Sequence, residues 1–103
     1  MKAVWMGVVA ASALLMVGTA QANADLAKAS GCLNCHTVDK KLVGPALKDI
    51  AAKYKDDPGA QARLEEKVKK GSTGTWGPIP MPPNSNVSDA NIKTLVTFIL
   101  SLK

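Results

Sequence analysis

The feature that most constrains this chain is the run Cys32-Leu33-Asn34-Cys35-His36, which holds its only two cysteines and its only histidine. Residues three apart in a helix lie on the same face, so both thiols can reach one edge of a planar ring system. The pattern C-x-x-C-H is the attachment signature of c-type haem. We therefore predict one haem c, held by thioethers to Cys32 and Cys35, with His36 as a ligand to an iron that cycles between Fe(II) and Fe(III).

Two other uses of this motif fit the sequence less well. A thiol–disulfide redox module normally combines its C-x-x-C pair with a βαβ pattern, and this chain has no alternating strand segment of useful length. A structural zinc site needs four ligands, and the chain has no further cysteine or histidine to supply the fourth. A haem also meets a physical need, because a domain this small buries too little surface to be stable without a staple.

The stretch W-G-P-I-P-M-P-P-N, residues 76–84, places four prolines around Met81. Proline fixes φ and removes a backbone donor, so this stretch is neither a helix interior nor a central strand. A haem iron bound by histidine on one side accepts a methionine thioether on the other, and this ligand raises the reduction potential. We predict that Met81 is this ligand, held near the iron by a stiff loop. In the alternative, Met81 packs against the haem edge and leaves the iron open.

The N-terminal sequence has the features of a secretory signal peptide. An apolar run follows Lys2, and Ala22-Asn23-Ala24 has small residues at the two positions that a signal peptidase reads. We predict that residues 1–24 are removed and that residues 25–103 form one domain in the periplasm. The alternative is an uncleaved membrane anchor, since the apolar run is just long enough to span a bilayer.

The charge balance is mildly basic. Thirteen lysine and arginine residues face eight aspartate and glutamate residues, for a formal net charge of +5. Loss of Lys2 with the signal peptide would leave twelve basic side chains against the same eight acidic ones. An excess of this kind can steer a protein toward an acidic partner. Nucleic acid is not expected as a partner, because the lysines are scattered rather than clustered.

The hydrophobic pattern indicates an all-α domain of four short helices. Their expected ranges and end signals are Leu26 to Leu33 capped by Asp25 or Asn23, residues 46–54 with Pro45 in the first turn, residues 60–70 ended by Gly71, and a last helix capped by Ser88. The last helix is expected to bury Ile92, Leu95, Val96, Phe98 and Ile99 against the first helix and the haem. The intervening loop, residues 71–87, is long enough to suggest a functional role.

From Gly31 to Lys103 the chain resembles the class I bacterial cytochromes c of the small c-551/c-552 type. The stretches that carry the resemblance are G-C-L-N-C-H, V-G-P-A-L-K-D-I-A-A-K-Y, K-G-S-T-G-T-W-G-P-I-P-M-P-P-N and V-S-D-A-N-I-K-T-L-V-T-F-I-L-S-L-K. The resemblance implies a fold of about four short helices wrapped round one covalently attached haem. It also implies that His36 and Met81 are the axial ligands of the iron.

The resemblance implies further contacts around the haem. The carbonyl of Pro45 would accept a hydrogen bond from the second nitrogen of His36 and so orient the ring. Trp76 would reach a haem propionate, or serve only as a packing residue beside the haem. Asn84 would form a hydrogen bond near the sulfur of Met81.

The sequence departs from its relatives at two places. Lys67 stands where many relatives carry arginine or histidine near a propionate, and lysine offers a point charge instead of a bidentate fork. Residues 84–86 form a segment that is one residue longer than in some relatives. This leaves open the rotamer of Met81 and whether Asn84 or Asn86 contacts its sulfur.

The resemblance implies a periplasmic one-electron carrier of a respiratory chain, not an enzyme, because two filled axial positions leave no place for a substrate. Its partners would be transient redox proteins, a reductase or an oxidase with an acidic docking surface, and the carrier itself would be a monomer. The docking patch is expected near Cys32, with Leu33, Val43 and Ile79 ringed by lysines. The alternative function is a haem-based small-ligand binder or sensor in which Met81 is displaceable.

Overall fold

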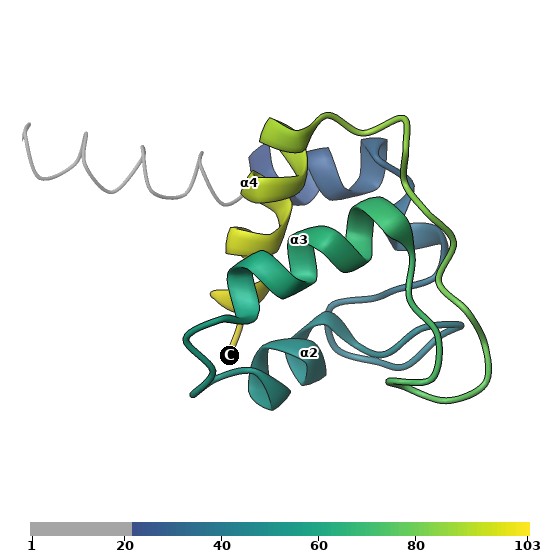
Figure 1. Cartoon of the computed structure of the whole chain (residues 1–103), viewed down its shortest axis with the longest axis vertical. Coiled ribbons are helices and arrows are strands. Elements are labelled where there is room, and N and C mark those ends of the chain that lie inside the picture. Colours follow the sequence, from purple (N-terminus) through teal and green to yellow (C-terminus); the bar gives the residue numbers. More distant parts are fainter. Residues whose placement is uncertain (1–21) are drawn as a thin grey trace, which may run out of the picture.

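The computed structural model describes residues 22–103, whose helices and long loops are shown in Figure 1. In chain order the elements are a helix that includes residues 22–29, the 3₁₀ helix η1 (Cys32–Asn34), and the α-helices α2 (Leu47–Lys53), α3 (Ala60–Lys70) and α4 (Asp89–Leu100). These residues contain no strand, only one isolated antiparallel bridge between Ser72 and Met81. The prediction of an all-α domain is confirmed.

Helix α3 and the start of α4 lie where the local signals placed them. Gly71 follows the last residue of α3 with a φ of 88°, and its N–H donates to the carbonyl of Lys67 at 2.9 Å. Few residues other than glycine adopt this φ. At α4, the hydroxyl of Ser88 accepts a hydrogen bond from the N–H of Asn91 at 3.2 Å, and Asp89 lies at the positive end of the helix.

The predicted first helix is wrong in its range and its cap. Residues 22–29 are already helical, so neither Asn23 nor Asp25 caps a helix that begins at Leu26. The α-helical turn ends before Gly31, which has a φ of 85° and precedes the separate helix η1. A left-handed residue cannot continue a right-handed helix, so the two cysteines lie in a short 3₁₀ turn of their own.

Helix α2 is two residues shorter than predicted, and Pro45 precedes it instead of lying in its first turn. Its N-cap is Ala46, with an extended ψ of 141°. The N–H of Leu47 donates to the carbonyl of Thr37 at 2.9 Å. The N–H of Lys48 likewise donates to the carbonyl of Val38 at 3.1 Å, so the loop after the C-x-x-C-H motif satisfies two of the free donors at the start of α2.

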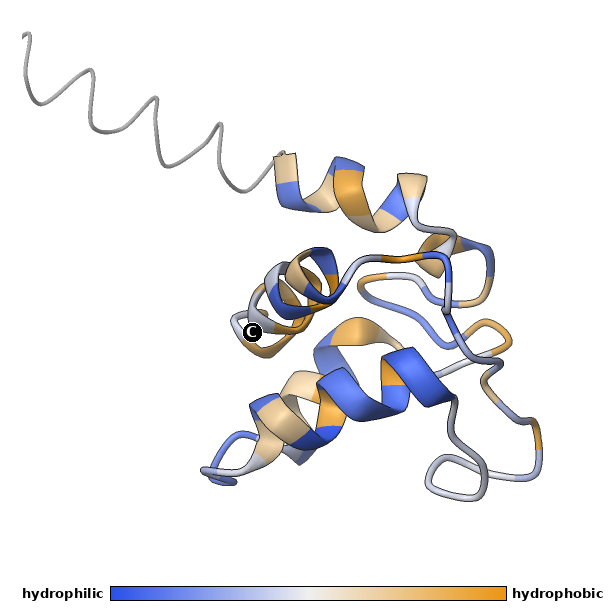
Figure 2. Ribbon diagram, turned by 45° about the horizontal axis from the view of Figure 1, so that its top comes forward, coloured by the Kyte–Doolittle hydropathy of each residue, from blue (hydrophilic) through white to orange (hydrophobic). Residues whose placement is uncertain are grey.

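The core is built around α4. Helices α2 and α3 each pack against α4, whereas these two described helices do not contact each other. Ile92, Leu95 and Val96 of α4 are buried as predicted, whereas Phe98 and Ile99 are only half-buried. Leu47 of α2 and Ala60 of α3 are also buried. Burying one large aliphatic side chain contributes about 1.5–3 kcal/mol. In Figure 2 most of the α3 ribbon has the colours of hydrophilic residues, with a few hydrophobic ones between them, as expected for a helix with one face on the core.

The predicted signal peptide lies mainly outside the described residues, since only its last three residues, 22–24, are described. Its removal and the domain boundary at residue 25 remain predictions. Over residues 22–103 every helix is too short or too polar to cross a lipid bilayer.

Candidate functional site

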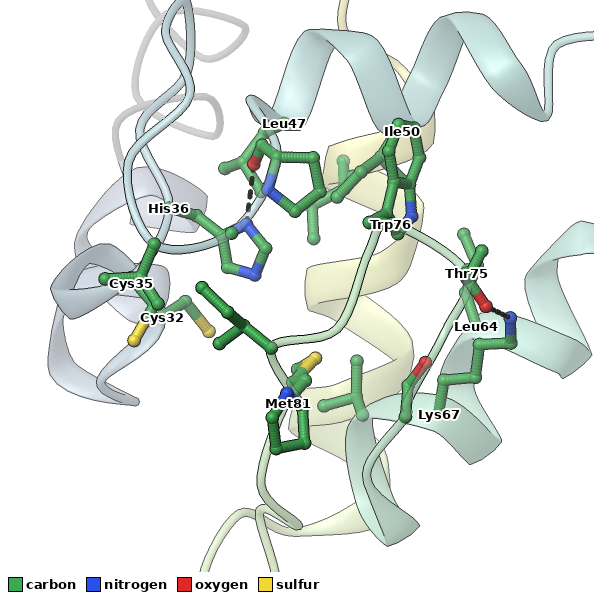
Figure 3. Close-up of a pocket in the computed structure, with 18 of the residues that line it drawn as sticks. Cys32, Cys35, His36, Leu47, Ile50, Leu64, Lys67, Thr75, Trp76 and Met81 are labelled. Carbon is green, nitrogen blue, oxygen red and sulfur yellow. Dashed lines mark hydrogen bonds between the residues drawn. The ribbon is translucent and has the colours of Figure 1, made fainter.

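A cavity lies between α2 and α3, next to the loops that follow η1 and α3 (Figure 3). It forms because both helices pack on α4 without packing on each other. The helices and the loops both contribute to its apolar lining. The helical residues are Leu47, Ile50, Leu64, Val68, Leu95, Val96 and Ile99, and the loop residues include Val43, Trp76, Ile79 and the prolines around Met81. The apolar faces of the helices therefore line this cavity as well as the packed core. A largely apolar cavity with a few polar groups is the usual form of a cofactor site.

Cys32 and Cys35 lie together at one edge of this cavity, and both thiols are free and half-buried (Figure 3). The turn that carries them is closed by the N–H of Cys35 on the carbonyl of Cys32 at 3.3 Å. Residues i and i+3 are eclipsed in a 3₁₀ turn, so both side chains leave the backbone in the same direction. Burial raises the pKa of the Cys32 thiol, an effect that a backbone hydrogen bond partly offsets.

His36 is buried and points into the cavity. Its Nδ1 lies 2.7 Å from the carbonyl oxygen of Pro45, which can only accept a hydrogen bond. In the neutral ring Nδ1 therefore carries the hydrogen, and the lone pair of Nε2 is available on the other side. This contact is the one implied by the resemblance, and it fixes both tautomer and ring orientation.

Gly44 leaves the space that the His36 ring occupies. A Cβ atom on Gly44 would lie 2.7 Å from Cε1 of His36 and 3.0 Å from Nδ1. The loop is held in this position by the N–H of Gly44, which donates to the carbonyl of Cys35 at 2.7 Å. The backbone around Gly44 and Pro45 thus forms a close-fitting seat for the imidazole.

Met81 lies on the side of the cavity across from His36 (Figure 3). Its backbone is fixed by two hydrogen bonds to Ser72, at 2.7 Å from its N–H and at 3.0 Å to its carbonyl. This pair is the isolated bridge of the fold. The proline-rich loop is therefore tied to the residue next to the end of α3, which limits how far Met81 can move.

Trp76 and Lys67 both line the cavity, on the side away from the two cysteines (Figure 3). Trp76 is 41% exposed, and the ammonium group of Lys53 lies 5.2 Å from the centre of its ring, within cation–π range. The ammonium group of Lys67 donates to the hydroxyl of Thr75 at 3.0 Å. This part of the wall thus combines an indole, a hydroxyl and the ammonium group of Lys67, groups that suit a carboxylate.

Asn84 also lines the cavity, but its hydrogen bonds lead away from it. Its side-chain amide donates to the carbonyl of Val68 at 3.0 Å and to that of Pro82 at 3.4 Å. Its backbone N–H donates to the same Val68 carbonyl at 3.1 Å. In the described structure the amide therefore anchors the end of the Met81 loop to α3, and the expected contact near the Met81 sulfur is not among its hydrogen bonds.

Sequence reasoning did not find three residues that shape the site: Gly44, Ser72 and Thr75. A glycine before a proline suggests only a turn, so nothing marked Gly44 as the residue that packs on His36. Ser72 acts through its backbone, for which its side chain gives no signal. The role of Thr75 depends on the fold, which brings it next to Lys67 across eight residues of chain.

The residues present fit a covalently attached haem. Two thiols lie at one edge, a histidine nitrogen and a thioether are presented from two sides, and the lining between them is apolar. Histidine with methionine is one of the axial pairs by which proteins hold haem iron. Fold and donor set together define a small c-type cytochrome.

Comparison with known proteins agrees with this class. The family model "Cytochrome c" matches residues 20–103, and the chain belongs to the cytochrome c family. It is 61% identical to cytochrome c-552 of Nitrosomonas europaea, over all of both chains. It is 54% identical to cytochrome c-551 of Pseudomonas aeruginosa over 78 residues, which cover 76% of this chain and 74% of that protein. The crystal structure of wild-type Nitrosomonas europaea cytochrome c552 superposes with a TM-score of 0.76 at 61% identity, covering 78% of this chain and 99% of that one.

These findings settle the cofactor and the general role. The cofactor is a c-type haem attached covalently through the cysteine pair of the C-x-x-C-H motif, as predicted. The protein is a small haem electron carrier that acts with redox partners. When bound, the haem supplies one-electron chemistry at its iron, and the polypeptide supplies attachment, ligands and shielding from water.

Proposed function

We propose that this protein is a periplasmic one-electron carrier of a respiratory chain, in which His36 and Met81 are the two axial ligands of the haem iron. One observation carries the proposal: the free Nε2 of His36 and the side chain of Met81 are presented to the same cavity from two sides. With both positions filled by protein, no open coordination site is left for a substrate. This is why we propose a carrier and not an enzyme.

The backbone around each ligand supports this role. The hydrogen bond to Pro45 orients the His36 ring, and the bridge to Ser72 holds the Met81 backbone, so both ligands are positioned in advance of any change in the charge on the iron. A thioether ligand favours the reduced iron and raises the potential. The proposed role of Asn84 is to fix the end of the Met81 loop on α3, through its hydrogen bonds to Val68.

Lys67 and Trp76 are the proposed partners of the haem propionates. The attached edge of the haem would lie at Cys32 and Cys35. Lys67 and Trp76 line the opposite side of the cavity, where the propionates would lie. An ammonium group and an indole N–H are suitable donors to a carboxylate. Replacing Lys67 by glutamine should therefore raise the pKa of a propionate, which is measurable as a change in the pH dependence of the reduction potential.

The proposed location follows from the predicted signal peptide over residues 1–24, whose removal would leave residues 25–103 as the exported domain. The mature N-terminus of the exported protein, read by mass spectrometry, tests this part directly. A mature chain that begins at Asp25 supports the prediction, whereas a full-length chain in the membrane fraction contradicts it.

The proposed docking face is the exposed apolar patch beside the cysteine edge of the cavity. Val43 is 48% exposed and Ile79 is 63% exposed, and both line the same cavity as the two cysteines. Leu33 of the expected patch is only half-buried, and Leu42, next to Val43 in sequence, is 52% exposed. Exposed apolar residues that gather at one site often mark an interaction surface. The basic residues Lys40 and Lys41 are close by in sequence. A weak, brief complex with an acidic partner surface fits this combination.

Stopped-flow electron transfer with an acidic redox partner tests the carrier and its docking face together. The rate constant should fall as salt is added, because the charges involved are exposed. At low salt, the variant Lys41→Glu should have a lower rate constant than the wild type. The matched variant Lys55→Glu should keep the wild-type rate constant, because Lys55 lies in the loop joining α2 to α3, on the other side of the molecule (Figure 1). A rate constant that is insensitive to salt and to both variants would contradict the proposed steering.

A further inference from the structure

We propose that Gly71 is a positioning residue for Met81: it allows the end of α3 to lie directly against the Met81 backbone and so sets where the sulfur sits. The inference rests on the proposed role of Met81 as an axial ligand. Ending α3 would by itself explain a glycine at this position. The proposal gives Gly71 a second role, which is to position Met81.

The first observation is the conformation of Gly71. Its φ and ψ are 88° and 172°, a region of backbone space that is essentially restricted to glycine. Its N–H still caps α3 by donating to Lys67 at 2.9 Å, and the next residue, Ser72, already pairs with Met81 through two hydrogen bonds. One residue thus turns the chain from helix into the bridge that holds the ligand.

The second observation is the lack of space at Gly71. A Cβ atom there would lie 2.8 Å from the carbonyl oxygen of Met81 and 3.1 Å from the nitrogen of Pro83. Ordinary contact begins near 3.4 Å, so the Met81 carbonyl would have to retreat by about 0.6 Å. Both neighbours are backbone atoms and cannot rotate out of the way, so the displacement would pass to Met81 itself.

The third observation is that the far end of the loop is anchored on the same turn of α3. Asn84 donates to the carbonyl of Val68 from its backbone N–H at 3.1 Å and from its side chain at 3.0 Å. Met81 is therefore held between two attachments to one helical turn. Because the loop is proline-rich between and beside these attachments, a shift at Gly71 cannot be absorbed by bending the chain near Met81.

The chain offers a matched control in Gly77. It belongs to the same loop and also has a positive φ, 119°, but a Cβ atom there would meet no other atom within 4 Å. Alanine at either position imposes an unfavourable backbone conformation, whereas only alanine at Gly71 pushes on Met81. Comparing Gly71→Ala with Gly77→Ala separates positioning of the ligand from simple loss of a glycine.

The experiment compares the haem-loaded wild type with both variants. In Gly71→Ala the long-wavelength absorption band of ferric methionine ligation should weaken, the reduction potential should fall, and the ferrous form should bind CO at least tenfold faster. Gly77→Ala should keep the wild-type band, potential and slow CO binding, even if its stability drops. Equal behaviour of the two variants would overturn the proposal.

Amide hydrogen exchange in the wild-type holoprotein provides a second test, which needs no variant and does not depend on Met81 binding iron. The amide of Gly71 donates to Lys67 and that of Met81 donates to Ser72, so both belong to the proposed attachment of the Met81 backbone to the end of α3. They should exchange at similar rates, at least tenfold slower than the amide of Gly77. Exchange at the Met81 amide as fast as at the Gly77 amide would overturn the proposal that the end of α3 holds the Met81 backbone. A wild type that lacks the methionine band but protects the Met81 amide would instead contradict the proposed ligation alone.

Discussion

Gly44 is the position at which one added methyl group should disturb the seat of His36 most directly. A Cβ atom there lies 2.7 Å from Cε1, 3.0 Å from Nδ1 and 3.2 Å from Nε2 of the imidazole. Since ordinary contact begins near 3.4 Å, the ring has to retreat by about 0.7 Å or tilt. Either movement strains the 2.7 Å hydrogen bond between Nδ1 and the carbonyl of Pro45.

The size of the effect follows from these two changes. Overpacking a tight site costs about 1–3 kcal/mol. Weakening the hydrogen bond of a buried group adds about 0.5–1.5 kcal/mol. Gly44 is not among the glycines with positive φ, so backbone strain contributes nothing further. We expect the free energy of unfolding of Gly44→Ala to fall by about 2–4 kcal/mol.

The assay is urea unfolding of the ferric holoprotein, followed by circular dichroism. Gly59→Ala serves as the control, because a Cβ atom at Gly59 lies 3.4 Å from the flexible end of Arg63, an ordinary contact. Because Gly59 is the N-cap of α3, its replacement should cost something, but less than about 1 kcal/mol. If Gly44→Ala also stayed within this range and kept the wild-type haem spectrum, the reasoning about the seat of His36 would be refuted.

Three further changes test the fold and the role of the haem in it. Leu95→Ala, at a side chain that is 1% exposed, should lower the free energy of unfolding by about 2–5 kcal/mol, whereas the exposed Lys93→Ala should change it by less than about 0.5 kcal/mol in the same urea titration. Ser88→Ala removes the cap on α4 and should cost about 1 kcal/mol by thermal unfolding, while Ser85→Ala in the exposed loop should have no measurable effect. The double variant Cys32→Ala, Cys35→Ala cannot attach haem covalently. It should lose most of its helical circular dichroism signal, because the apolar cavity wall then has nothing to pack against. A wild-type signal in this variant would contradict the structural role of the haem.

Local signals made part of the fold predictable from the sequence. Gly71 and Ser88 were identified correctly as the end of α3 and the cap of α4, since both act within a few residues of their own position. The break at Gly31 was missed, because a glycine beside a helical pattern does not reveal whether its φ is positive. The turn that presents the two cysteines was therefore predicted as part of a longer helix.

The parts of the site that lie in a local sequence motif were predictable, whereas the parts that depend on contacts between distant segments were not. The C-x-x-C-H run was enough to place the haem attachment, and the resemblance supplied the hydrogen bond from His36 to Pro45. The bridge from Ser72 to Met81 and the packing of Gly44 were beyond prediction. Each depends on the backbone of one residue meeting another residue eight or nine positions away, and such contacts leave no pattern in residue type.

The most direct test of the account is the absorption spectrum of the haem-loaded protein, ferric and ferrous, with and without CO. The account predicts a weak long-wavelength band in the ferric form, which is characteristic of methionine ligation, and at most slow binding of CO by the ferrous form at neutral pH. A covalent haem that lacks this band and takes up CO rapidly would mean that Met81 does not hold the iron. The protein would then have an open site suited to a small-molecule ligand, and the proposed carrier mechanism would be contradicted.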